Sequence, residues 1–115
     1  MRAIPPEARE ELDKLERKHS EHPEGRYFVP LANAYRKAGD TERAKALLRE
    51  GLQRHPEYVS AHIVLGRCLI DDQAEADAEA EFRRVLTLDS QNLIALKSLG
   101  ELAARGTRTG EARDW

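Results

Sequence analysis

A pattern of small and large apolar residues recurs in this sequence every 34 residues. Its three copies carry Leu31-Ala32 with Ala44, then Leu65-Gly66 with Ala78, then Leu99-Gly100 with Ala112. Self-similarity at a fixed period of roughly 20–50 residues predicts a stacked array of repeats. A single unit of such an array cannot bury its own apolar face, so its stability comes from packing on its neighbours.

Within each period the apolar spacing predicts two helices joined by a tight turn. Pro5-Pro6 suits the first turn of a helix, and Gly39 can take the left-handed conformation that ends one. Gln73 stands one period after Gly39, where a non-glycine residue costs on the order of 1 kcal/mol. The expected helices span residues 4–20, 27–38, 41–54, 59–71, 74–88 and 93–104, and a further helix begins at Gly106 and runs to Trp115.

This helix-turn-helix repeat resembles the tetratricopeptide repeat. The copies match the family pattern first at Leu31-Ala32, Tyr35, Gly39, Ala44, Leu48 and Pro56, then at Leu65-Gly66, Leu69, Ala78 and Phe82, then at Leu99-Gly100, Ala103 and Ala112. The resemblance implies an all-α fold, an α-solenoid of antiparallel helix pairs that coils as a right-handed superhelix. It divides the chain into an N-terminal capping helix (1–22), two repeats (23–56 and 57–90) and an incomplete third repeat (91–115).

The third repeat lacks its outer half in this sequence, so we expect an exposed apolar face at the C-terminal end of the array. Two interpretations fit. The chain is a segment of a longer repeat protein, or it forms a homodimer that completes the array through the open C-terminal end.

Net charge, apolar runs and cysteine content indicate which classes of protein this chain is not expected to belong to. A net charge of -2 predicts no general affinity for nucleic acid or for an anionic membrane. No apolar run reaches the roughly 18–20 residues of a membrane span, and the N-terminus lacks the apolar core of a signal peptide. The single cysteine, Cys68, allows no internal disulfide. These features favour a cytoplasmic protein.

The residues that could bind a metal or take part in catalysis are spread along the sequence and form no recognisable motif. His19 and His22, with Glu16, have no cysteine or further histidine nearby in sequence to complete a metal site. Cys68 lies in a predicted helix beside the apolar residues Leu69 and Ile70 and is expected to be a buried, inert thiol. The acidic run that starts at Asp71-Asp72 is better explained as a helix start and a solvated face than as a calcium loop. We therefore expect no enzyme activity and no cofactor.

The resemblance implies that the first helix of each repeat lines a concave groove, which in this family commonly holds an extended peptide or a helix of a partner protein. The best candidates for the groove are Val29, Asn33, Arg36, Lys37, Ile63, Arg67, Ile70, Lys97, Glu101 and Arg105, with Arg26, Ser60, Asp71, Ile94 and Ala104 beside them. Six of these side chains are positive and two are negative. This asymmetry predicts a partner that bears Asp, Glu or a free C-terminal carboxylate.

Individual roles follow from side-chain chemistry. Arg36 and Arg67 are candidates for bidentate carboxylate binding. Asn33 can hydrogen-bond a peptide main chain. Val29, Ile63 and Ile70 are candidate apolar contacts. The alternative is that all of these are ordinary solvated helix residues.

Chaperone-binding members of the family clamp a terminal carboxylate with a Lys/Asn/Asn/Lys/Arg set. Here only Asn33 matches that set, and Val29 and Val64 stand where the clamp needs Lys and Asn. We therefore expect an interaction module that is not an adaptor for chaperone tails. The alternative is a structural repeat segment that packs within a longer protein or self-associates and binds no peptide.

Overall fold

The computed structural model describes residues 4–112, with side chains described for residues 4–106, and over this range the chain forms six α-helices and no β-strand. The helices are α1 (Pro6–Glu21), α2 (Phe28–Lys37), α3 (Thr41–Arg54), α4 (Val59–Asp71), α5 (Glu75–Leu88) and α6 (Leu93–Ala112). The expected all-α class is confirmed.

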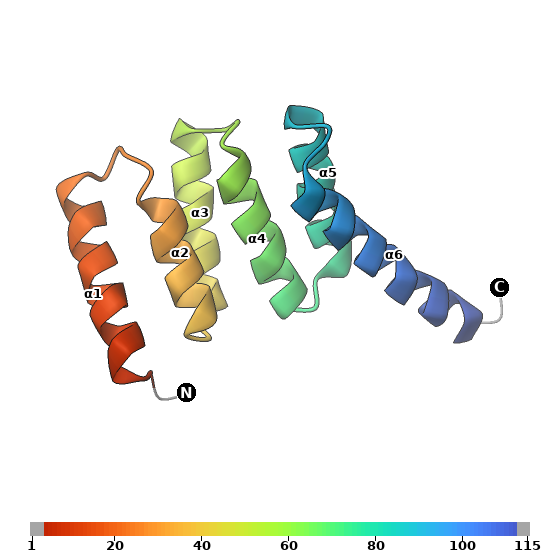
Figure 1. The fold of residues 1–115 in the computed structure, drawn as a ribbon, viewed down its shortest axis with the longest axis horizontal. Helices are drawn as coiled ribbons and strands as arrows, with labels where there is room; N and C mark the ends of the chain where they lie inside the picture. The colour runs from red at the N-terminus through yellow and green to blue at the C-terminus, as the bar shows by residue number, and fades with distance from the viewer. Residues whose placement is uncertain (1–3, 113–115) are drawn as a thin grey trace.

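The helices lie in a row in chain order, from α1 at one end to α6 at the other (Figure 1). α2 packs on α3 and α4 on α5 as antiparallel pairs, and each pair also packs on the next helix along the chain. α2 touches α4 directly, so the first helices of these two pairs share one face. The array measures 52 × 33 × 20 Å with a radius of gyration of 15.6 Å, above the roughly 13 Å of a compact domain of this length. It is an open solenoid, as expected.

Local sequence chemistry sets the helix ends. Pro6 occupies the first turn of α1. The Asp40 carboxylate accepts a hydrogen bond from the Arg43 backbone N–H and caps α3. The turns inside the two pairs require a left-handed residue, which is Gly39 (φ 89°) in one and Gln73 (φ 62°) in the other. The turn at Gln73 therefore takes the left-handed conformation that the sequence predicts for this position.

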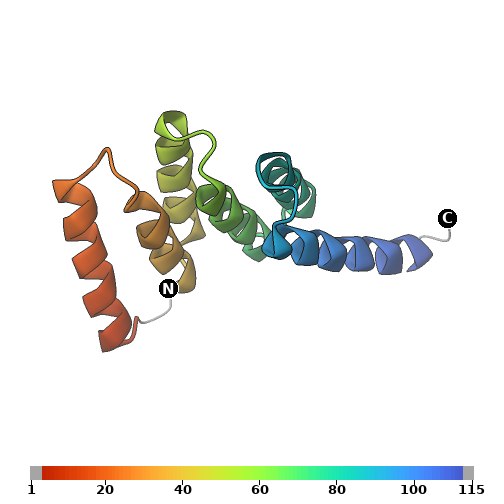
Figure 2. The same ribbon diagram turned by 45° about the horizontal axis from the view of Figure 1, so that its top comes forward.

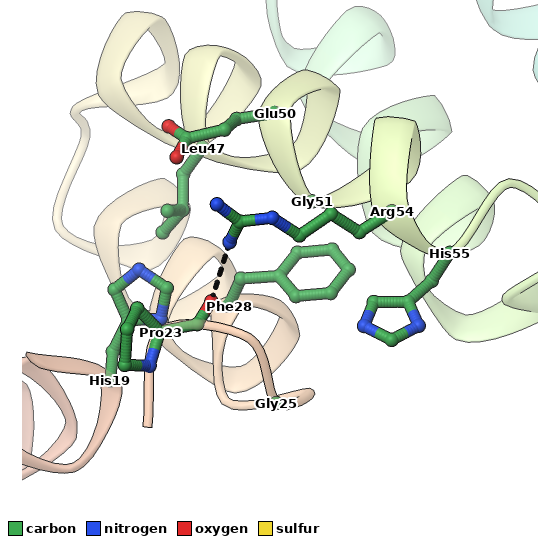
Figure 3. A pocket seen from close by; sticks show the side chains of 9 residues that line it. All are labelled: His19, Pro23, Gly25, Phe28, Leu47, Glu50, Gly51, Arg54 and His55. Atoms are coloured by element: carbon green, nitrogen blue, oxygen red, sulfur yellow. Dashed lines mark hydrogen bonds between the residues drawn. The ribbon is translucent and has the colours of Figure 1, made fainter. Parts of the chain in front are cut away.

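Small residues let the helices of each pair approach closely. A Cβ atom at Gly66 of α4 would lie 2.7 Å from the Phe82 ring of α5, and one at Gly51 of α3 would lie 2.2 Å from the Phe28 ring of α2. Phe82 is fully buried and Phe28 is 1% exposed. Figure 3 shows the Phe28 ring between Gly51 and the stacked His55 ring. Gly66, one of the repeating small residues, and Gly51 thus make room for a large aromatic side chain of the partner helix.

Ion pairs and hydrogen bonds connect neighbouring helices. Lys45 of α3 pairs with Asp72 at the end of α4 at 2.5 Å, and Thr41 donates a hydrogen bond to the same carboxylate. The hydrogen bond from Lys45, followed by that from Thr41, lowers the pKa of Asp72. The buried His62 ring lies 2.8 Å from the Glu81 carboxylate of α5 and 2.8 Å from the Pro56 carbonyl oxygen. At the other end, the Tyr35 hydroxyl donates to Glu16 and joins α1 to α2.

The C-terminal part differs from expectation. The sequence predicts that a helix ends near Ala104 and that another begins at Gly106, but α6 runs unbroken from Leu93 to Ala112. A glycine in a helix interior costs about 1 kcal/mol relative to alanine, which weakens the helix without ending it. Gly106 does not take a positive φ, since Gly39 is the glycine that does so in the described chain. Trp115 lies outside the described residues.

Candidate functional site

The first helices of the repeats, α2, α4 and α6, carry the residues that the sequence predicts for a peptide groove; we call the surface formed by these residues the groove face. Its predicted members are Val29, Asn33, Arg36, Lys37, Ile63, Arg67, Ile70, Lys97, Glu101 and Arg105. The described structure brings some of these side chains together across helices and buries others.

Arg36 is already engaged at the junction of α2 and α4. Its guanidinium lies 3.1 Å from the Asp71 carboxylate and donates a 3.1 Å hydrogen bond to the Asn33 side-chain oxygen. The Arg36 side chain is 19% exposed. Arg36, Asn33 and Asp71 therefore form a polar link between two repeats, and a ligand that binds Arg36 competes with Asp71.

Two other predicted cations also have partners. Arg26 stacks over the Tyr58 ring at 4.8 Å. Arg105 of α6 pairs with Glu75 of α5 at 3.2 Å. The charge count from the sequence treats Arg26 and Arg105 as available to a ligand, but both side chains already make contacts within the chain.

Three cations of the groove face have no ion-pair partner among the side chains of residues 4–106: Lys37, Arg67 and Lys97. Lys37 and Lys97 are exposed and Arg67 is half-buried. They come from α2, α4 and α6, one from each first helix. The available positive charge of the groove face is thus centred on Arg67 rather than on Arg36.

The apolar members lie deeper than expected. Val29 and Ile63 are each 7% exposed and belong to the core. Ile70 is half-buried and Ile94 is 42% exposed. Of the predicted apolar contacts, Ile70 and Ile94 are the ones that keep appreciable exposed surface. Val64, which stands at a position of the chaperone clamp, is also only 7% exposed.

A hollow of about 920 Å³ lies where the N-terminal half of α1 faces the end of α2. It takes in Arg36, Lys37 and Asp71 of the predicted site. Its other walls come from α1, the α2–α3 turn and Asp72: Ile4, Arg9, Leu12, Glu16, Tyr35, Ala38, Gly39, Asp40, Thr41 and Arg43. Sequence reasoning missed the α1 wall because α1 stands outside the three matched copies of the repeat, so its register is not fixed by the period.

The remaining candidates for chemistry are Cys68 and the histidines at the end of α1. Cys68 is fully buried, and burial raises the pKa of its thiol to about 11. Among the described residues, no three His, Cys, Asp or Glu side chains gather as a metal site would require. His19 borders a cavity of only about 10 Å³, which Phe28, Leu47 and the Arg54–Pro23 hydrogen bond enclose (Figure 3). No described helix is both long and apolar enough to cross a membrane.

Comparisons with known proteins identify a family with this helical repeat architecture. The tetratricopeptide repeat profile matches residues 29–92. The chain is 31% identical over 85 residues to the type IV pilus assembly protein PilF of Pseudomonas aeruginosa, a match covering 74% of this chain and 34% of that protein. It is 36% identical over 92 residues to cellulose synthase operon protein C of Xanthomonas axonopodis pv. citri, a match covering 76% of this chain and 6% of that protein. The chain therefore spans about a third or less of these two curated relatives.

A solved structure shares the fold. The first tetratricopeptide domain of Spaghetti (RPAP3), bound to the HSP90 peptide SRMEEVD, superposes with a TM-score of 0.81 at 19% identity, covering 88% of this chain and 81% of that one. Because the family profile covers more than half of the 115 residues, the resemblance seen in the sequence is confirmed. The chain belongs to the tetratricopeptide repeat family.

Proposed function

We propose that the chain is a protein-interaction module whose groove face binds an extended acidic or C-terminal peptide, or a helix, of a partner protein. One observation supports this proposal most directly. Lys37, Arg67 and Lys97 lie on three successive first helices and have no ion-pair partner among the described side chains. Cations that project from one face without a partner favour an anionic ligand along that face.

The fold neighbours support the same class of function. The RPAP3 domain binds a peptide with two glutamates and a terminal aspartate. At 19% identity this likeness shows the fold alone, so the peptide is a guide to ligand class and not to the partner of this chain. Binding of acidic peptides by a shared scaffold agrees with the charge of the groove face.

The ligand is expected to differ from chaperone tails. Val29 and Val64 occupy clamp positions, and each is 7% exposed. A buried valine offers neither a charge nor a hydrogen bond to a terminal carboxylate. We therefore expect recognition through side-chain carboxylates near Arg67 and Lys97. Cytoplasmic localisation stays a prediction.

A second function, self-association or packing within a larger assembly, is supported by a different observation. Leu93 is 79% exposed and Leu96 is 47% exposed on α6. Large apolar side chains at such exposure favour contact with another protein surface. In this alternative the groove face binds nothing specific.

The test is a fluorescence anisotropy titration with a panel of labelled acidic peptides, each paired with a version in which Glu and Asp become Gln and Asn. The double variant Arg67→Glu/Lys97→Glu should weaken binding of the acidic peptides roughly tenfold or more. Arg36 is left unchanged because reversing its charge would put two carboxylates side by side at Asp71 and destabilise the α2–α4 contact.

The matched control is Arg49→Glu/Arg84→Glu, which makes the same change in net charge on exposed positions of α3 and α5. It should leave binding nearly unchanged. Equal loss in both double variants would mean that only net charge matters, and retained binding in Arg67→Glu/Lys97→Glu would place the ligand elsewhere. The peptide SRMEEVD serves as a reference, and tight binding of it would refute the expected difference from chaperone tails.

A further inference from the structure

The hollow beside α1 adjoins the groove face and has the size of a ligand site. In both views of the ribbon, the α2–α3 turn lies between the start of α1 and the end of α4 (Figures 1 and 2). These segments supply the walls of the hollow, whose volume is about 920 Å³. Ligand sites typically measure roughly 300–1,000 Å³. Because Arg36 and Lys37 belong to both surfaces, a ligand on the groove face can extend into the hollow.

The acidic side chains of the hollow are all engaged within the chain. Glu16 accepts a hydrogen bond from a tyrosine hydroxyl of α2. Asp40 caps α3, and Asp72 lies 2.5 Å from a lysine of α3. The fourth acid is Asp71, whose carboxylate lies 3.1 Å from the Arg36 guanidinium.

The cationic side chains are less fully engaged. The hollow is lined by Arg9, Arg36, Lys37 and Arg43. Arg43 lies over the Tyr35 ring at 5.2 Å. Arg9 of α1 and Lys37 of α2 are exposed and have no ion-pair partner among the side chains of residues 4–106. The charge that the hollow leaves unpaired is therefore positive, which favours an anionic group.

Arg36 can keep its position when Asp71 leaves it. Its Nε donates a 3.1 Å hydrogen bond to Asn33, and its Nη1 donates a separate 3.1 Å hydrogen bond to Asp71. The Arg36 side chain is 19% exposed, whereas that of Asp71 is 40% exposed. An ion pair at such exposure contributes little to stability. A second carboxylate can therefore replace Asp71 while Asn33 still orients the guanidinium.

Helix stability does not explain an acid at position 71. Asp71 is the last residue of α4, where the partial negative charge of the helix end favours a cation. The same position carries Lys37 one period earlier and Arg105 one period later. The contact with Arg36 is thus the interaction in which the Asp71 charge is favourable.

We propose that the hollow binds an Asp or Glu side chain of the acidic ligand, and that Asp71 is a built-in competitor for this subsite. The ligand carboxylate replaces Asp71 at Arg36, with Arg9 and Lys37 as the neighbouring cations. Asp71 therefore lowers the affinity of the chain for weakly acidic ligands. This inference rests on the function proposed above and extends the site to α1, which lies outside the groove face.

The probe is a fluorescein-labelled hexaglutamate peptide with an amidated C-terminus, titrated by fluorescence anisotropy. Asp71→Asn removes the competing charge, although the amide oxygen still accepts a hydrogen bond from Arg36. It should tighten binding about threefold or more. Asp77→Asn makes the same change at an exposed position of α5 and should have little effect. The gain should disappear when Arg36→Gln/Asp71→Asn is compared with Arg36→Gln, because the competitor acts through Arg36.

Arg9→Glu tests the wall that α1 supplies. It should weaken binding about fivefold or more, because it places a negative charge beside the ligand carboxylate. Arg17→Glu makes the same change on α1 at an exposed position outside the hollow and should leave binding nearly unchanged. Thermal melts of each variant show that the fold is kept. Binding only by a hexaglutamate with a free C-terminus would overturn the assignment to side-chain carboxylates.

The outcomes separate this inference from the proposed function. If the groove double variant Arg67→Glu/Lys97→Glu weakens binding while Asp71→Asn has no effect, the groove proposal stands and the subsite is overturned. If the groove double variant binds normally while Asp71→Asn tightens and Arg9→Glu weakens binding, the subsite stands without the groove. Absence of binding to both the unaltered chain and Asp71→Asn would overturn both.

Discussion

The close approach of Phe82 to Gly66 yields the sharpest prediction about stability. In Gly66→Ala the new Cβ would lie 2.7 Å from Cζ and 2.8 Å from Cε2 of a fully buried ring. Contacts this short force the ring or the helix to move, and overpacking of a core costs about 1–3 kcal/mol. Alanine also gains about 1 kcal/mol of helix propensity over glycine. We expect a net loss of unfolding free energy of up to ~2 kcal/mol.

Gly100→Ala is the internal comparison. Gly100 is the same position one period later, but its Cβ would meet nothing within 4 Å. This variant keeps the propensity gain without the clash and should stabilise α6. The difference between the two variants isolates the Phe82 contact, at about 1–3 kcal/mol. Gly51→Ala, with Phe28 only 2.2 Å away, should cost at least as much as Gly66→Ala.

Urea unfolding followed by far-ultraviolet circular dichroism measures these differences, and hydrogen exchange reports on α6 if that helix unfolds separately. The double variant Gly66→Ala/Phe82→Leu tests the cause, because a smaller side chain should recover part of the loss caused by Gly66→Ala in a double-mutant cycle. If Gly66→Ala proved as stable as Gly100→Ala, the close packing of α4 on α5 described here would be wrong.

Three further predictions concern single side chains. Gln73→Gly should raise the melting midpoint, because it relieves the positive φ of 62° at a gain of up to about 1 kcal/mol; a lower midpoint would contradict this. Because burial raises the pKa of the Cys68 thiol to about 11, Ellman's reagent at about pH 8 should react far more slowly with the native chain than with the urea-unfolded chain, and similar rates would refute the burial. The pKa of Asp72 is lowered from 3.8, first by the hydrogen bond from Lys45. The Asp72 carboxylate therefore stabilises the fold above pH 3.8, its unfolded value. This stabilisation is lost as the pH falls through the lower pKa of the folded state. Asp72→Asn should therefore cost no more than about 1 kcal/mol near neutral pH and weaken the acid dependence of the urea midpoint, whereas an unchanged acid dependence would rule out this role.

Much of the fold follows from local sequence chemistry. The fixed period predicts the stacking, and Gly39 and Pro6 mark helix ends where the structure has them. The recurring small residues mark positions where helices approach closely, and at Gly66 the structure places the Phe82 ring. These features depend on neighbours in sequence or on a register that the repeat fixes, so the sequence suffices.

The site was less predictable because it depends on contacts between repeats. The pairing of Arg36 with Asp71 joins residues on adjacent helices, and formal charge counting does not detect it. The depth of Val29 and Ile63 depends on how closely α2 approaches α4. The sequence predicts a helix boundary at Gly106, but α6 continues through this residue because a glycine weakens a helix without ending it.

We propose that ligands bind the groove face, which α2, α4 and α6 carry. The most direct measurement is a nitrogen-15 NMR titration of the full chain with the acidic peptide that binds most tightly. We predict that the largest shift changes fall on the backbone amides around Asn33, Arg67 and Lys97. Shift changes centred instead on the exposed residues of α3 and α5, such as Arg49 and Arg84, would contradict the account.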